Sequence, residues 1–171
     1  TTGLSSQYDR IIEIGAQKIQ SGKVIGEFSS LIKVKDRLSR VVQKLTGISE
    51  SMLADKPDIS EVLPKFLNFI KGSILVAHNA SFDMGFLKAE SSRLDVDLEW
   101  SACCTLKLAR VFLADLESKS LDAIAKHYGF IFESRHRSIG DVKVTVSFLQ
   151  RLLTDEREKL VSWADMQSFE V

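Results

Sequence analysis

The sequence is poor in the residues that crosslink or interrupt small proteins, with two cysteines and two prolines in 171 residues. Cys103 and Cys104 are adjacent, so a disulfide between them is geometrically awkward, and no Cys/His spacing suggests a zinc site. No apolar run approaches the roughly 18 residues that a membrane span needs, and no signal-peptide pattern opens the chain. We therefore expect reduced thiols, no membrane partner and a cytoplasmic protein.

The sequence also lacks an excess of either charge, since 23 basic residues balance 23 acidic ones. Without a long basic tract it is unsuited to coating a nucleic-acid duplex. An enzyme that grips a few nucleotides through metal ions is not excluded, because it needs few phosphate contacts. A hydrophobic fraction of 44% with 27% charged residues is that of an ordinary globular chain, and the length predicts one domain.

The pattern of apolar residues predicts a mixed α/β domain. Two β-rich runs at 10–19 and 27–34, joined across Gly22 and Gly26, predict an antiparallel hairpin. The short apolar run from Ser73 to His78 predicts a central strand that is buried on both faces. Helical periodicity occurs from Leu38 and at 58–72, 82–94, 105–113, 120–129 and 139–153, with a last amphipathic segment at about 156–169. Together these segments indicate a mixed sheet flanked by helices.

The first polar cluster follows the predicted buried strand. That strand ends at His78 and a helix begins within four residues, which is where sites form in open α/β sheets. Asn79 or Ser81 can cap the helix, and Asp83 falls in its first turn. Asp83 is then either a functional acid or an ordinary first-turn charge, and His78 alone is more often a hydrogen-bonded residue at a strand end.

The second cluster lies before a long amphipathic helix. His136 is in a loop, and Asp141 follows five residues later at the start of the helix. A loop histidine beside a helix-borne carboxylate is a plausible base next to a metal ligand. The alternative is a basic loop, Arg135 to Arg137, followed by another acid at a helix start.

The order of the motifs is more specific than any one of them. TTGL at the start, HNxxFD about 75 residues later and HxxxxD about 55 further on resemble the DEDDh family of 3'-to-5' exonucleases, typified by the epsilon proofreading subunit of bacterial DNA polymerase III. The resemblance runs from Thr1 to about Leu153 and leaves a helical tail at about 154–171. It implies a ribonuclease H-like mixed β-sheet flanked by helices.

The resemblance also implies a mechanism. The family uses two divalent ions about 4 Å apart for in-line displacement at phosphorus. Hard Mg²⁺ or Mn²⁺ prefers oxygen ligands, and Asp83 and Asp141 match the metal-linked acids of the second and third motifs. His136 matches the general base, expected on a mobile loop.

By the same resemblance, the opening segment lines the pocket for the terminal nucleotide. Its residues are Thr1, Thr2, Gly3 and Leu4. The alternative is a strand end followed by a turn hydrophobe.

Three residues of the first cluster are weaker candidates for substrate contacts. Phe82 could stack on a base or belong to the core. His78 and Asn79 could orient the site or a phosphate.

In this family, TTGL directly follows a strand ending in D-x-E, which supplies two of the four metal-binding carboxylates. We therefore expect such a strand before Thr1, and residues 1–171 to form a single exonuclease-like domain that lacks it. The expected function is removal of nucleotides from single-stranded 3' ends, in DNA proofreading or repair, and a DNA polymerase subunit is a candidate partner. The alternative is a catalytically impaired relative that binds strand ends or a polymerase partner without cleaving.

Overall fold

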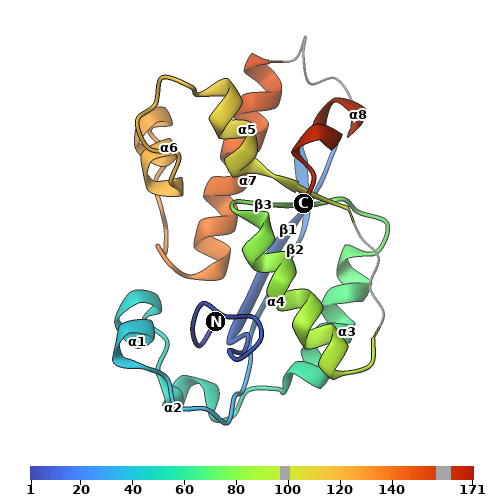
Figure 1. Ribbon diagram of the computed structural model, residues 1–171, viewed down its shortest axis with the longest axis vertical. Helices are drawn as coiled ribbons and strands as arrows, with labels where there is room; N and C mark the ends of the chain where they lie inside the picture. Colours follow the sequence, from blue (N-terminus) through green and yellow to red (C-terminus); the bar gives the residue numbers. More distant parts are fainter. Residues whose placement is uncertain (97–100, 157–162) are drawn as a thin grey trace.

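The computed structural model describes residues 1–96, 101–156 and 163–171. Its elements are, in chain order, β1 (Glu13–Gln20), β2 (Lys23–Leu31), α1 (Arg40–Thr46), α2 (Glu50–Leu53), α3 (Ile59–Ile70), β3 (Leu75–Ala77), α4 (Ala80–Arg93), β4 (Ala102–Cys104), α5 (Thr105–Phe112), α6 (Leu121–Tyr128), α7 (Ser138–Asp155), α8 (Trp163–Met166) and the 3-10 helix η1 (Gln167–Phe169). The chain combines strands with helices packed against them (Figure 1), so the predicted α/β class is confirmed.

The strands of the described residues form two separate two-stranded sheets. β1 and β2 are the predicted antiparallel hairpin, and they turn through Ser21 and Gly22, which both have positive φ. β3 and β4 pair in parallel. Both strand directions of a mixed sheet are thus present, but within the described residues no ladder joins β1 to β3, so each has an edge without a strand partner.

The predicted central strand, β3, is less buried than expected because one of its edges has no strand partner. β3 is shorter than the run from Ser73 to His78, and its three residues are only half-buried. β4 is the fully buried strand, and the sequence reasoning did not predict it. Three residues, two of them the adjacent cysteines, are too few to show a strand period.

The chain end packs on the other side of β4. Glu170 forms an antiparallel bridge to Cys103, and the Val171 N–H donates to the Ala102 carbonyl at 3.0 Å. Of the amphipathic segment predicted at about 156–169, residues 157–162 lie outside the described residues, and the rest forms α8 and η1. The cysteines are buried and unpaired, and burial raises the pKa of the Cys103 thiol to about 11.

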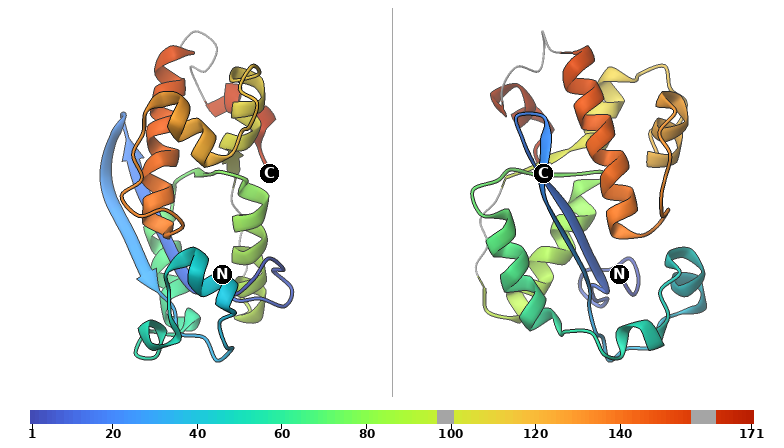
Figure 2. Two further views of the ribbon diagram at one scale, coloured as in Figure 1. Left: turned by 90° about the vertical axis from the view of Figure 1, so that its left-hand side faces the viewer. Right: turned by 180° about the vertical axis from the view of Figure 1, so that it is seen from behind.

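The two largest of four apolar clusters in the described residues join strands to helices. The first joins the hairpin to α3 and α4, and its buried residues are Ile11, Ile14, Ile32, Ile59, Val62, Leu63, Phe66, Phe86 and Leu87. The second joins β4 to α5, α6 and α7, and its buried residues are Cys103, Leu108, Ala109, Ile124, Phe148, Leu149 and Leu152. In side view the hairpin and α4 lie on opposite sides of the molecule (Figure 2), and α7 packs against β1.

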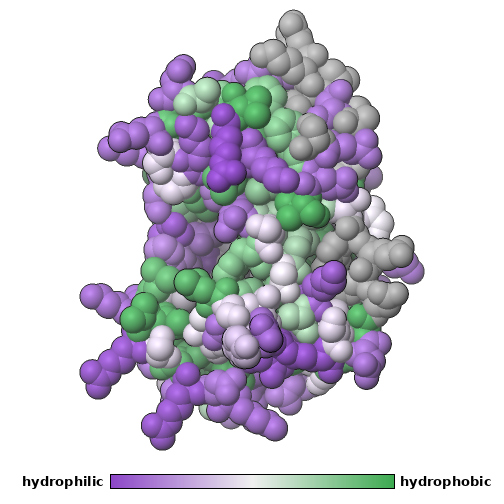
Figure 3. Space-filling model, viewed as in Figure 1, coloured by the Kyte–Doolittle hydropathy of each residue, from purple (hydrophilic) through white to green (hydrophobic). Residues whose placement is uncertain are grey.

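Apolar side chains also remain at the surface. Val41 and Leu45 of α1 are 75% and 52% exposed, and green atoms gather over α1 at the lower left of Figure 3. None of the helices in the described part of the chain combines the length and apolarity needed to cross a bilayer.

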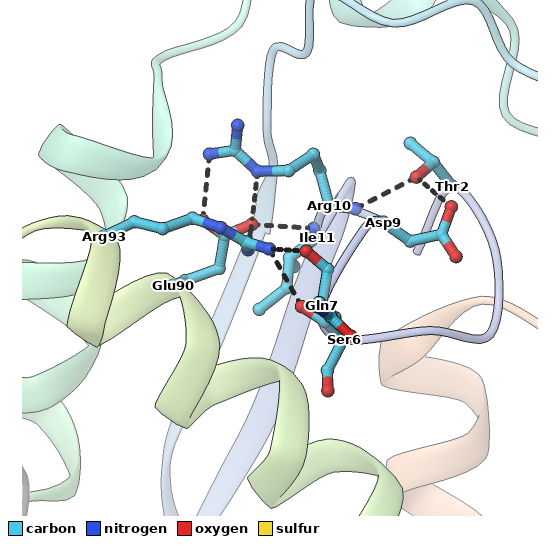
Figure 4. Close-up of polar contacts among 8 residues, drawn as sticks. All are labelled: Thr2, Ser6, Gln7, Asp9, Arg10, Ile11, Glu90 and Arg93. Atoms are coloured by element: carbon cyan, nitrogen blue, oxygen red, sulfur yellow. Dashed lines mark hydrogen bonds and ion pairs between the residues drawn. The ribbon is translucent and has the colours of Figure 1, made fainter.

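A buried carboxylate ties the N-terminal loop to α4. Glu90 is buried in α4, with 1% of its side chain exposed, and accepts two hydrogen bonds from the Arg10 guanidinium at 2.8 and 2.9 Å (Figure 4). The Ile11 N–H donates to the same carboxylate at 3.3 Å. Because a buried charge is tolerated only when it is paired and hydrogen-bonded, these contacts fix where β1 begins.

The neighbouring arginine of α4 extends the same network to the loop. Arg93 donates to the carbonyls of Ser6 and Gln7, each at 2.9 Å (Figure 4). Within the loop, the Thr2 hydroxyl donates to Asp9 at 3.1 Å. The loop is therefore held by side chains at both of its ends.

We expect Glu90→Ala to lower the free energy of unfolding by about 3 kcal/mol, because it leaves Arg10 without its partner and the Ile11 N–H without an acceptor. Glu61→Ala, at an exposed site in the first turn of α3, is the control and should cost less than about 1 kcal/mol. Denaturant unfolding followed by circular dichroism measures both. Equal costs would show that the buried pair does not stabilise the loop.

Candidate active site

A large cavity lies between the two sheets. It has a volume of about 1170 Å³ and is lined by β1, β3, α3, α4 and α7. Small-molecule pockets usually occupy about 300–1,000 Å³, so this space exceeds them. The strands without a partner on one side, β1 and β3, are both part of its wall.

Asp83 lies in the first turn of α4 and lines this cavity. Its side chain is accessible to solvent, yet the cavity walls crowd it and displace much of its hydration. This desolvation raises the pKa of Asp83 to about 6, and the charge of Asp141 acts in the same direction. A carboxyl group with a raised pKa in a cleft indicates a functional site.

Asp141 enters the same cavity from the first turn of α7. Burial raises its pKa, although the Arg135 guanidinium donates to both carboxylate oxygens at 2.8 and 3.0 Å and opposes that effect. The sequence-predicted pair of acids, Asp83 and Asp141, is thus brought together by the starts of two helices that lie far apart in the chain.

Arg135 is a member of this site that the sequence reasoning treated only as part of a basic loop. It also donates to both oxygens of Asp122 in α6, at 2.5 and 2.7 Å, and it lowers the pKa of that carboxyl group. One guanidinium therefore bridges α6 and the first turn of α7. Nothing in the sequence spacing links Asp122 to this loop, so the contact could be found only from the fold.

His136 sits beside Asp141 through its backbone. Its N–H donates to an Asp141 oxygen at 3.3 Å, and its φ of 63° is in the left-handed region. This conformation is uncommon for a residue with a side chain. The imidazole is half-buried and does not line the cavity. Its role as a base stays a prediction.

His78 and Asn79 occupy the turn between β3 and α4. His78 Nδ1 is hydrogen-bonded to the buried Thr105 hydroxyl at 3.0 Å, and burial lowers the pKa of its imidazole. Asn79 stands at the N-cap with φ of 63°, but its side chain makes no capping bond. Both line the cavity. The geometry of His78 matches the hydrogen-bonded strand-end alternative, while substrate contacts stay a prediction.

Phe82 belongs both to the core and to the cavity wall. Its ring packs against Phe86 with centroids 4.9 Å apart, and it also lines the cavity. The core alternative therefore describes its packing.

The opening segment forms one end of the loop that Glu90 anchors. Thr1 lines the cavity and Thr2 bonds back to Asp9 and Arg10, whereas Leu4 is 87% exposed. A Cβ at Gly3 would lie within 3 Å of the Asp9 carboxylate, so a side chain at position 3 would displace it.

The donor set suits a hard divalent ion. Asp83 and Asp141 supply carboxylate oxygens, which Mg²⁺ and Mn²⁺ prefer. Across the described residues, no group of three or more His, Cys, Asp or Glu side chains is arranged to hold a metal. These two acids fit one side of such a site and do not complete it.

Two carboxylates from helix starts over one cavity are the kind of ligand that metal-assisted phosphoryl transfer uses. The family model described as Exonuclease matches residues 1–149, so the chain belongs to the exonuclease family.

Curated relatives point to the same family. The chain is 42% identical to DNA polymerase III PolC-type of Caldanaerobacter subterraneus over 158 residues, which is 92% of the chain and 11% of the relative. It is 43% identical to the PolC-type polymerase of Thermotoga maritima over 90% of the chain and 11% of the relative. The chain thus spans about a tenth of the length of these relatives.

Solved structures confirm the ribonuclease H-like fold. Exonuclease X in complex with 5' overhanging duplex DNA is 27% identical, with a TM-score of 0.79 over 99% of this chain and 94% of that one. Escherichia coli Exonuclease I in complex with a dT13 oligonucleotide is 17% identical, with a TM-score of 0.83 over 92% and 40%, and shows the fold alone. The predicted DEDDh family is therefore confirmed.

The raised pKa of Asp83 makes stability depend on pH. The folded value of about 6 lies above the ordinary 3.8, so the folded protein binds the proton more tightly than the unfolded chain. Protonation of Asp83 therefore stabilises the folded protein fully below the unfolded pKa, and this stabilisation is lost as the pH rises from about 4 to about 6.

In EDTA, Asp83→Asn should remove this loss. We expect the free energy of unfolding to be about 1 kcal/mol higher than that of the unmodified protein at pH 8, and little different at pH 4. The gain at pH 8 is smaller than the full pKa shift implies, because solvent screens an exposed charge. Asp115→Asn, at an exposed site after α5, is the control. A pH-independent difference between Asp83→Asn and the unmodified protein in thermal unfolding would contradict the raised pKa.

Proposed function

We propose that this domain removes nucleotides one at a time from nucleic-acid 3' ends, with the help of divalent metal ions. The observation that carries the proposal is the convergence of Asp83 and Asp141 on one cavity, where loss of hydration raises the pKa of each carboxyl group. The names of the relatives, PolC-type polymerases and Exonuclease X, support a role on DNA in proofreading or repair.

Each residue has a distinct part in the proposed reaction. Asp83 and Asp141 would hold Mg²⁺ or Mn²⁺, two ions in a complete site, which supply a Lewis acid for attack at phosphorus. His136 would accept a proton from the attacking water, a task for which an imidazole is suited. Thr1 to Leu4 would receive the terminal nucleotide, with Phe82, His78 and Asn79 near its path.

The cavity supports the further proposal that an additional strand completes the site. A strand between β1 and β3 would pair with both available edges and fill a space whose walls are mostly apolar, including Ile14, Phe66 and Val76. Exposed edges and unfilled apolar space are both unfavourable. The D-x-E sequence expected on this strand would add two carboxylates to the two observed.

The alternative is a relative that binds strand ends or a polymerase subunit without cleaving. The observation in its favour is that the described residues contain no group of three or more His, Cys, Asp or Glu side chains that could hold a metal. We propose single-stranded 3' ends and a polymerase as partners, and the cytoplasm as the location. A nuclease assay on the full-length protein separates the two functions.

In the full-length protein, Asp141→Asn should lower nuclease activity at least 10³-fold, because the ions lose a ligand they need in the transition state. Asp155→Asn, in the last turn of the same helix, should leave it unchanged. The assay follows mononucleotide release from a 3'-labelled single strand. EDTA should stop it, and cleavage inside an end-blocked strand would contradict the proposed polarity.

His136→Ala should lower the rate by about 10²- to 10⁴-fold while leaving the affinity for metal and strand ends nearly unchanged, because a base acts on the proton and not on binding. Rates from single turnover and affinities from fluorescence anisotropy give the two quantities. If the variant keeps its rate and loses affinity, His136 is a phosphate contact instead.

A further inference from the structure

The start of α7 has no cap from its own sequence. Arg137 occupies the N-cap with an extended backbone, and its side chain makes no capping hydrogen bond to the helix. Helix starts leave backbone N–H groups without partners, which polar side chains usually accept. Here the acceptor comes from another element, because the Ser138 N–H donates to Glu13 Oε2 at 2.8 Å.

Glu13 is the first residue of β1, some 125 positions away in the sequence, and its side chain is only 7% exposed. Its other oxygen, Oε1, accepts two hydrogen bonds from the Arg137 guanidinium, at 3.0 and 2.7 Å. The pair raises the pKa of Arg137. One carboxylate thus holds both the residue before the helix and its first N–H.

Backbone packing closes the same junction. A Cβ at Gly15 would lie 2.5 Å from the Ser138 hydroxyl and 2.9 Å from the Ile139 nitrogen, so β1 and the first turn of α7 touch. A Cβ at Gly140 would lie within 2 Å of the Ser134 carbonyl oxygen, so the preceding loop folds tightly over the helix start. The segment from Ser134 to Gly140 is therefore packed closely at this junction.

The two residues with proposed roles in catalysis lie on either side of this junction. His136 precedes Arg137 and has a left-handed backbone that the surroundings must maintain. Asp141 follows Ser138 by three residues, in the first turn of α7. A shift of the helix start would therefore displace the base and the metal-linked acid together.

We propose that Glu13 is a positioning residue, which sets the placement of His136 and Asp141 by capping α7 from β1 and clamping Arg137. The proposal rests on the proposed exonuclease function. Glu13 also lines the cavity, but both of its oxygens are occupied by Arg137 and Ser138, so its action on the site is exerted through the loop and helix that it holds.

The test uses the full-length protein with Glu13→Gln, which keeps the shape of the side chain and removes its charge. The control is Glu27→Gln on β2, where an exposed carboxylate accepts from Gln17 at 2.9 Å. We expect Glu13→Gln to lower kcat about 10- to 100-fold with KM and Mn²⁺ affinity changed less than about twofold, and Glu27→Gln to match the unmodified protein.

Arg137→Ala, alone and combined with Glu13→Gln, tests whether Glu13 acts through Arg137. If Glu13 acts through Arg137, the double variant should be no slower than the slower single variant, whereas independent losses would multiply. Multiplied losses, or an unchanged kcat in Glu13→Gln, would overturn the proposal. The proposal would also be overturned if Glu13→Gln changed the Mn²⁺ affinity strongly but left kcat at saturating Mn²⁺ unchanged. That result would indicate that Glu13 is a metal ligand.

Hydrogen exchange gives a readout that needs no activity. Glu13→Gln should speed exchange of the amides of the first turn of α7 about tenfold or more, while amides near Leu152 at its other end stay protected. Unchanged exchange would overturn the positioning role even if the protein cleaves nothing. An inactive unmodified protein would refute the exonuclease function alone.

Discussion

The fold depends on how its two separate strand pairs are positioned around one cavity. β1 and β3 each have one edge without a strand partner, and within the described residues no backbone ladder connects the pairs. Their relative position is therefore set by helices: α4 packs against the hairpin core on one side, and α7 packs on β1 while sharing a core with β4. Because these two helices begin at the cavity, the same packing places their first-turn acids.

Charged side chains define that packing at two junctions. Glu90 fixes the start of β1 through Arg10, and Glu13 fixes the start of α7 through Arg137. Buried pairs of this kind add little net stability against apolar replacements, but they are costly to break and tolerate few alternative arrangements. Here the two pairs determine the position of the segments they join, which are about 80 or more residues apart in the sequence.

The local pattern of apolar and polar residues is sufficient to predict the elements whose sequences follow a regular period. The hairpin, the helices and the first-turn positions of Asp83 and Asp141 follow from alternation, helical spacing and capping chemistry. β4 was missed because three residues carry no period, and the burial of β3 was overestimated because its free edge borders the cavity. The contacts of Arg135 and Glu13 join segments that are distant in the sequence, and no local pattern records such contacts.

The electrostatics of the cavity agree with the proposal that its acids hold a cation. Two carboxyl groups with pKa values raised by burial are costly to ionise side by side, and Arg135 compensates only Asp141 directly. A divalent ion would relieve the desolvation of both more fully than one guanidinium, which must also serve Asp122. Since Arg135 donates to Asp122 as well as to Asp141, a cation bound to Asp141 would leave the bond between Arg135 and Asp122 intact, and with it the connection between α6 and the loop.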